Sequence, residues 1–113
     1  MWNLNLLSIL KYVDRNTEVW IKSEDHELIN GQLCGRDGWA LLAGRGDARG
    51  YTVGWLINEL MQLPPEEHIG IMDPEAGIYD FVNVAYEKDI TMVKDYRGYK
   101  EGETVHLLIL SDM

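Results

Sequence analysis

The apolar residues of this chain follow the same order twice, and the second set lies 50 positions after the first. In each set, residues recur at spacings of three and four, which is typical of one buried face of a helix. The members are Leu6, Leu7, Leu10 and Val13 in the first set and Leu56, Ile57, Leu60 and Leu63 in the second. Each predicted helix is followed by a strand with apolar residues two apart, at Val19/Ile21 and Ile69/Ile71. The pattern predicts two similar units.

Each unit continues with a polar turn and two further predicted strands. These strands are expected near 28–33 and 39–43 in the first unit, and at 78–87 and 90–94 in the second. The apolar run at 105–110 has no polar face, so it predicts an extra C-terminal strand inside a sheet.

The length of 113 residues suits one domain with its own core. We therefore expect a single α+β domain over 1–113, in which two helix-plus-antiparallel-strand units pack together. Its pseudo-repeat halves are 1–44 and 51–113, and the glycine-rich stretch 44–50 joins them. Chance similarity of two unrelated units is the alternative to duplication.

The helix ends carry local signals. Asn3 or Asn5 is expected to cap the first helix, and Thr52 the second, because their side-chain oxygens can accept from free N–H groups. Pro64-Pro65 is expected to end the second helix, since proline lacks an N–H.

The net charge of −9 is unevenly distributed. Residues 1–50 carry a charge of −1, and residues 51–113 carry −8. A negative field repels phosphate backbones, which disfavours direct nucleic-acid binding and suits a basic protein partner. The alternative is that the acidic charge only keeps a small protein soluble.

The segment from Thr52 to Pro65, followed by Ile69-Gly70-Ile71 and Asp73, resembles a motif of small uncharacterised bacterial and phage proteins. That motif is T-V-x-x-L-I-x-x-L-x-x-L-P, followed by a V-x-V strand and an acidic turn. The resemblance implies a capped helix that docks on a strand, and a small accessory domain carried by a mobile element. It supplies no catalytic residues.

No signal peptide or membrane-spanning run is visible, and the single cysteine, Cys34, excludes an internal disulfide. We therefore expect a cytoplasmic protein that does not act on membranes. Cys34 has no histidine near it in the sequence, so a small apolar role at a strand end is favoured over that of a nucleophile.

The residues that could carry chemistry are scattered. His26, His68 and His106 show no metal-ligand spacing, and we expect neither a metal nor a cofactor. An alternative function is that of a small hydrolase, which would use Asp73, Glu75 and His68. Turn formation explains the Asp-Pro pair without catalysis, however, so we expect no enzyme.

The aromatic and acidic residues give the candidate partner-binding set. Trp20 alternates with core residues of its strand, and Trp55 lies off the apolar face of its helix. Exposed tryptophan and tyrosine dominate binding hot spots. The full set is Trp20, Trp55, Asp73, Glu75, Asp95, Tyr96, Tyr99, Glu101 and Glu103, and its last four members lie in a loop expected to be exposed at 96–103. The alternative is that these tryptophans cover the edges of the core.

These patterns favour a non-enzymatic, acidic protein-binding module. A sharper hypothesis is a phage or mobile-element inhibitor that docks its carboxylates on a basic surface of a host protein. A structural homo-oligomer is the other alternative, in which a second copy covers an exposed sheet edge.

Overall fold

The computed structural model describes residues 1–22, 27–36, 39–44, 49–73 and 78–112, and for 27–36, 39–44, 72–73 and 78–79 it describes the backbone alone. The helices are α1 (Asn3–Leu10) and α2 (Val53–Leu60). The strands are β1 (Glu18–Lys22), β2 (Glu27–Arg36), β3 (Trp39–Gly44), β4 (His68–Asp73), β5 (Ile78–Phe81), β6 (Val84–Thr91) and β7 (Thr104–Ser111). The chain is therefore the mixed helix-and-sheet protein that the sequence predicts.

Within the described residues, the strands form one seven-stranded sheet in the order β5-β4-β3-β2-β1-β7-β6. Neighbouring strands are antiparallel except at two places: β1 pairs with β7, and β3 with β4, in parallel. Each parallel pair joins a strand of the first half to a strand of the second. The prediction of two helix-plus-antiparallel-strand units in one domain does not include these parallel pairs, through which the halves share one sheet.

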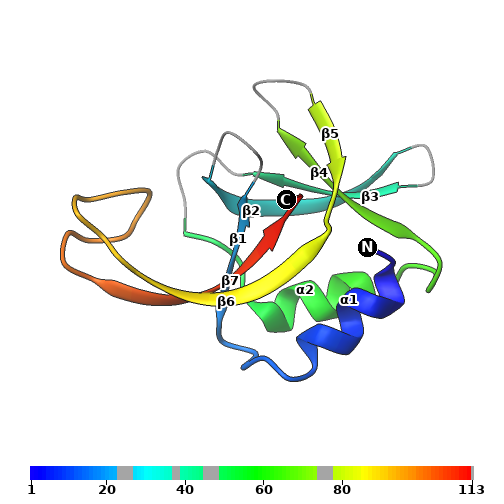
Figure 1. Cartoon of the computed structure of the whole chain (residues 1–113), viewed down its shortest axis with the longest axis horizontal. Coiled ribbons are helices and arrows are strands. Elements are labelled where there is room, and N and C mark those ends of the chain that lie inside the picture. Colours follow the sequence, from blue (N-terminus) through cyan, green and yellow to red (C-terminus); the bar gives the residue numbers. More distant parts are fainter. Residues whose placement is uncertain (23–26, 37–38, 45–48, 74–77, 113) are drawn as a thin grey trace.

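Both helices lie side by side on one face of the sheet (Figure 1). Their buried leucines meet the strand residues that point toward them, and the two sets form the main core. On the helices these are Leu6, Leu10, Leu56 and Leu60, and on the strands Val19, Ile21, Ile69, Ile71, Leu108 and Leu110. The predicted helix faces and strands are confirmed here, except that Leu7, Ile57 and Leu63 are only partly buried.

The opposite face of the sheet carries a second core cluster. Successive strand residues point to opposite faces, so Trp20, Leu107 and Ile109 face away from the helices. The segment 92–103, which links β6 to β7, contributes Met92 and Tyr99 to this cluster. In Figure 1 this segment, in orange, extends past the helices at the end of the β6–β7 hairpin. Among the described side chains, it packs on residues of β1 and β7, with Ile90 of β6 partly buried against them.

The backbone contacts at the start of α1 recur at the start of α2, 50 positions later. Trp2 forms a bridge with His68, and Thr52 forms one with Glu18. The N–H of Asn3 donates to the Glu67 carbonyl at 2.7 Å. In the same way, the N–H of Val53 donates to the Thr17 carbonyl at 2.8 Å. Each helix therefore begins against the strand of the other half, which ties the halves together reciprocally.

The predicted N-terminal cap is found in α2 but not in α1. Thr52 caps α2 as predicted, because its Oγ1 accepts from the Trp55 N–H at 3.3 Å. In α1 the cap position is Trp2, with no side-chain cap bond, so the predicted Asn3 or Asn5 cap is wrong. Asn3 is instead buried, and its Nδ2 lies 2.8 Å from the Leu60 carbonyl. The Asn3 amide therefore supplies a hydrogen-bond donor for the carboxyl end of α2. That helix ends at Leu60, before Pro64-Pro65.

The predicted strands of the second half need correction after β4. The run 78–87 is split at 82–83 into β5, which pairs with β4, and β6, which pairs with β7. Residues 87–89 lie in the middle of β6 and do not form a turn, so the predicted strand at 90–94 is wrong. The predicted final strand is confirmed as β7, which lies between β1 and β6. Residues 45–48 of the predicted join lie outside the described residues.

Candidate protein-binding surface

Three of the predicted binding residues meet on the second face of the sheet, and two of them are buried. The Trp20 side chain is only 3% exposed, and its ring centroid lies 5.6 Å from that of Tyr99 and 5.9 Å from that of Tyr96. Its Nε1 donates to the Tyr99 hydroxyl at 3.1 Å. Trp20 and Tyr99 therefore anchor segment 92–103. Trp20 lacks the exposure that a contact role required and instead covers the core, as the alternative interpretation had it, and the expectation that Tyr99 is exposed in its loop is wrong. The aromatic rings are drawn inward because they cover β1 and β7, which no helix covers on this face.

Arg49, at the edge of this cluster, forms ion pairs with the carboxylates of Glu18 and Glu103. The Arg49 guanidinium lies 4.1 Å from the Tyr99 ring centroid. Its Nε is 3.0 Å from Glu18 Oε1, and its Nη1 is 3.0 Å from Glu103 Oε2. Glu18 raises the pKa of Arg49, mainly through its hydrogen bond. Burial raises the pKa of the Tyr99 phenol. The hydrogen bond from the Lys100 backbone N–H lowers the pKa of Glu103, and the bond from Arg49 lowers it to a smaller extent. Glu103 thus stabilises segment 92–103.

A tight turn sets the position of Tyr99. Tyr96 and Tyr99 exchange backbone hydrogen bonds of 2.9 and 2.8 Å around Arg97 and Gly98. Both central residues have positive φ, 46° and 88°, as in the hairpin turn that fits the twist of its strands. Asp95 and Glu101 lie outside this turn, exposed, and Asp95 Oδ1 accepts from the Glu101 N–H at 2.8 Å. Asp95 and Glu101 are thus the carboxylates of this loop that face solvent as predicted.

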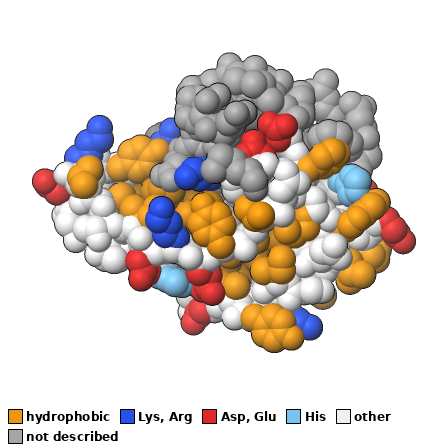
Figure 2. All heavy atoms as spheres, viewed as in Figure 1, with side chains coloured by type: hydrophobic (Ala, Val, Ile, Leu, Met, Phe, Trp, Pro, Cys, Tyr) orange, Lys and Arg blue, Asp and Glu red, His pale blue; other side chains and the backbone are white. Residues whose placement is uncertain are grey.

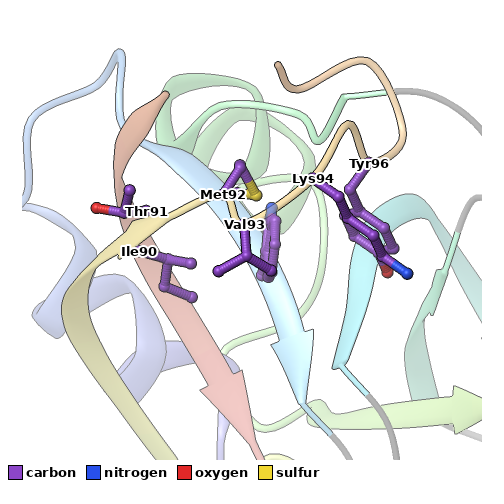
Figure 3. A pocket seen from close by; sticks show the side chains of 7 residues that line it. Ile90, Thr91, Met92, Val93, Lys94 and Tyr96 are labelled. Atoms are coloured by element: carbon purple, nitrogen blue, oxygen red, sulfur yellow. The ribbon is translucent and has the colours of Figure 1, made fainter. Parts of the chain in front are cut away.

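A shallow hollow of about 180 Å³ opens beside this cluster (Figure 3). It is lined by Trp20, Ile90, Thr91, Met92, Val93, Lys94 and Tyr96. Figure 3 shows Ile90 and Thr91 pointing in opposite directions from the strand, as alternation requires. Sites for drug-sized ligands measure roughly 300–1,000 Å³, so this hollow has the size of one inserted side chain.

Exposed apolar side chains continue from the hollow along β6. Val84, Tyr86 and Val93 are all exposed, and Val93 reaches 85%. Figure 2 shows hydrophobic side chains across the middle of the visible face, with charged side chains of both signs toward one end. From Lys88 to Glu103 the carboxylates alternate with Lys88, Lys94, Arg97 and Lys100. This end of the molecule therefore does not present a surface of one sign.

A second exposed aromatic group lies at the other end of the sheet, and the sequence interpretation missed it. The Trp2 side chain is 48% exposed, and its ring centroid lies 3.7 Å from that of His68. The His68 ring in turn meets Phe81 edge-on, with 4.9 Å between centroids. Trp2 precedes the apolar face of its helix, so helical periodicity gave no signal for it. The available signal was its position 50 residues before the cap residue Thr52.

The loop before β4 carries two glutamates and lies next to the start of α1. The Leu4 N–H donates to the Pro65 carbonyl at 3.2 Å, so the loop 64–67 lies against the start of α1. Leu4 and Glu66 are exposed there, and Glu67 is partly exposed. We refer to the Trp2 surface, which consists of Trp2, Leu4, Glu66, Glu67, His68 and Phe81. It combines apolar contact area with negative charge.

The other predicted residues fall in different places. Trp55 is half-buried and stacks on Tyr51, with 4.1 Å between centroids and an interplanar angle of 19°. Asp73 ends β4, but its side chain lies outside the described residues, as does that of Cys34. Glu75 is not described at all. The structure therefore brings neither Asp73 nor Glu75 into a described site with His68.

An exposed histidine lies between two carboxylates on the helix-side face of the β6–β7 hairpin. His106 Nε2 is 2.8 Å from Glu87 Oε1, and Nδ1 is 2.5 Å from Asp89 Oδ1. These hydrogen bonds raise the pKa of His106, and the bond to Glu87 has the larger effect. Among the described residues, no group of three or more histidine, cysteine, aspartate or glutamate side chains is arranged to hold a metal ion.

The comparisons with known proteins give no functional lead. No family model, curated protein or solved structure matches this chain. The resemblance of segment 52–73 to small bacterial and phage proteins stays a prediction. No helix in the described part of the chain is long and apolar enough to cross a membrane.

Proposed function

We propose that this chain is a non-enzymatic, cytoplasmic protein-binding domain whose partner is basic, and that the Trp2 surface makes the contact. The observation that carries the proposal is the half-exposed Trp2 indole. Its ring packs against the His68 ring, which in turn meets Phe81. A large aromatic side chain held in one orientation loses little entropy on binding, which is why such residues dominate hot spots.

Charge supports a basic partner. Between Arg49 and Lys88 the chain contains no lysine or arginine. The same stretch contains seven acidic residues: Glu59, Glu66, Glu67, Asp73, Glu75, Asp80 and Glu87. The Trp2 surface takes Glu66 and Glu67 from this stretch, so complementary charge would favour a lysine- or arginine-bearing partner.

The narrower hypothesis of a phage or mobile-element inhibitor has less support. An inhibitor that displaces nucleic acid needs carboxylates gathered on one face. Glu18 and Glu103 instead share an ion pair with Arg49, and the residues after Lys88 mix both signs. Among the described residues, the Trp2 surface is one acidic region that could serve this purpose.

We also propose that the halves 1–44 and 51–113 descend from one duplicated unit. The reciprocal contacts at Trp2/His68 and Thr52/Glu18 support this, because two unrelated units would not exchange the same hydrogen bonds.

Two alternatives receive weaker support. A homo-oligomer would form most simply at β6, an edge strand whose centre carries Glu87, Lys88 and Asp89. Charges at this position are typical of edges protected from pairing. A hydrolase would use His68 as a base, but the described contacts of its ring are with Trp2 and Phe81.

Site-specific photocrosslinking tests the proposal. Benzoylphenylalanine replaces Trp2, and in a control it replaces Tyr12, which is 82% exposed. After irradiation in the native host, we expect a discrete adduct with a basic protein from position 2 and not from position 12. Equal adducts from both positions, or none from position 2, would contradict a contact at the Trp2 surface.

A further inference from the structure

Strand β6 has one edge without a partner strand. It is the last strand of the sheet order, so among the described residues it pairs with β7 alone. It runs for eight residues, whereas β5, at the other end of the sheet, has four. An edge strand presents free backbone N–H and C=O groups, to which another extended chain can add as a further strand. The side chains of β6 therefore decide which chain can pair there.

The helix-side row of β6 is acidic. Glu87 and Asp89 follow Ala85 at intervals of two, and Ala85 packs against the helix-side core, so all three point to that face. The Glu87 and Asp89 side chains are 45% and 68% exposed. His106 of β7 bonds to both carboxylates, which holds them in place along the strand. Even a protonated His106 leaves these three side chains with a net negative charge. A strand beside this row therefore meets negative charge at alternate positions.

The opposite row of β6 is mainly apolar. Val84 and Tyr86 are exposed, and Ile90 packs partly against the second core cluster. The hollow lined by Ile90 and Val93 lies at the end of this row (Figure 3). Lys88 belongs to the same row, because it lies two residues from both Tyr86 and Ile90. Its charge repels a second cation on this face. A partner strand is therefore favoured when its basic residues face the helix side and its apolar residues face this row.

A second copy of this chain does not meet that requirement. Two β6 strands that pair antiparallel about a two-fold axis keep the same faces, so each residue lies opposite its own copy or a residue an even number of positions away. The two registers that pair nearly the whole strand place Glu87 opposite Glu87 or opposite Asp89. Like charges directly opposite each other destabilise a sheet. The other edge strand, β5, contains Asp80 and neither lysine nor arginine, so it supplies no complementary charge.

We propose that the free edge of β6 binds an extended segment of a partner protein in which lysine or arginine alternates with apolar residues. The segment adds to the sheet as a further strand, with its cations facing Glu87 and Asp89. Its apolar side chains cover Val84 and Tyr86, and one of them fills the hollow at Val93. In this mode of recognition backbone pairing supplies affinity, and the alternating side chains supply specificity. The contact is separate from the Trp2 surface and does not depend on it.

Titration with two isomeric heptapeptides tests this proposal. In one peptide four lysines alternate with three valines. In the other the three valines precede the four lysines, so that charge and composition are unchanged. Backbone amide resonances of a ¹⁵N-labelled sample report the contact. We expect the alternating peptide to shift the resonances of β6 and to bind roughly three- to tenfold more tightly than the block peptide, because only the alternating peptide matches both rows.

Hydrogen exchange distinguishes strand addition from a purely ionic contact. Successive residues of an edge strand direct their N–H groups alternately toward the neighbouring strand and toward the free edge. We expect the alternating peptide to slow the exchange of the β6 amides that face the free edge, because new backbone hydrogen bonds protect them. The block peptide should leave their exchange unchanged.

Matched variants complete the test. Glu87→Gln and Asp89→Asn should each weaken binding of the alternating peptide about two- to fivefold. Val93→Ala, which removes part of the apolar contact at the hollow, should weaken it by about twofold. Glu101→Gln removes an exposed carboxylate of segment 92–103 and should leave the affinity unchanged. Retained backbone spectra establish that each variant is folded.

Four outcomes would overturn the proposal: equal affinity for both peptides, resonance shifts only outside β6, unchanged exchange of the β6 amides, or equal effects of Glu87→Gln and Glu101→Gln. Light scattering without peptide should return the mass of one chain. A dimer in which the outward β6 amides are already protected would assign this edge to a second copy and overturn the proposed occupant. If photocrosslinking at position 2 still captures a basic partner in any of these cases, the function proposed for the Trp2 surface stands.

Discussion

The amide of Asn3 donates to three carbonyl groups at the carboxyl end of α2, those of Leu60, Leu63 and Pro64. Such carbonyls have no partner inside their own helix. One side chain at the start of α1 therefore completes the end of a helix more than fifty residues away. The sequence interpretation placed Asn3 as a local cap, because asparagine at a helix start is typical of that role.

We expect Asn3→Ala to destabilise the protein by about 1–3 kcal/mol, since it removes the buried hydrogen bond from the Asn3 amide to the Leu60 carbonyl, which joins α1 to the end of α2. Urea unfolding followed by circular dichroism measures this change. The matched control is Asn5→Ala, at an exposed position of the same helix, where we expect a change within about 0.5 kcal/mol. Equal effects of the two substitutions would contradict the role assigned to the Asn3 amide.

His106 gives a pH-dependent prediction. Glu87 and Asp89 raise its folded-state pKa above the ordinary value of 6.5, so folding favours the protonated ring. Its contribution to stability is therefore fully present below about pH 6.5 and is lost as the pH rises through the folded-state pKa. Histidine NMR titration should show the raised pKa, and Glu87→Gln should lower it. A His106 pKa that does not respond to Glu87→Gln would rule out this cause.

At the scale of elements, the loop 96–103 was expected to be exposed, yet segment 92–103 buries Tyr99 and covers one end of the sheet. Its turn at Arg97-Gly98 is a local feature that sequence can indicate. Whether the tyrosines on either side point outward or inward depends on Trp20, which lies 79 positions from Tyr99 along the chain. Sequence patterns read within a short window do not contain that information.

Two glycines of this segment allow a matched comparison. Gly98 and Gly102 both have positive φ, 88° and 85°, which an alanine adopts at a cost of about 1–2 kcal/mol. A Cβ at position 98 would lie 2.9 Å from Arg49 Cγ, whereas at 102 it would meet nothing within 4 Å. We expect Gly98→Ala to destabilise the protein more than Gly102→Ala in thermal unfolding. It should also speed amide hydrogen exchange around Tyr99, because it displaces Arg49.

Equal thermal shifts for the two variants would mean that the Arg49 contact contributes little. The second observable is local: relative to the rest of the sheet, only Gly98→Ala should speed amide exchange near Tyr99. An equal local increase in both variants would contradict the specific role of Arg49 in holding this segment.

At the scale of the whole molecule, neither half completes a core by itself. β1 of the first half pairs with β7 of the second, and β3 pairs with β4, so the sheet is shared. The helices share one core with strands of both halves. Sequence periodicity predicted the helices and the strands that follow them because each such segment is local. It did not predict the joining pairs, which connect strands distant in sequence.

A divided chain tests this dependence. If the protein is produced as two fragments that meet within 45–48, we expect each fragment alone to lack a cooperative thermal transition. An equimolar mixture should regain the helix signal of the intact protein by circular dichroism. Cooperative unfolding of either fragment alone would show that the halves are independent domains.

The sequence by itself determined the two amphipathic helices, the strands that follow them, the Thr52 cap and the buried final strand. Each of these follows from side-chain spacing or from one residue's local hydrogen bonding. The tertiary structure decided the rest. It paired β1 with β7, drew Trp20 and Tyr99 inward against the face that the helices leave open, and left Trp2 half exposed above His68. Burial depends on which strands become neighbours, and that choice is made by contacts between residues far apart in the chain.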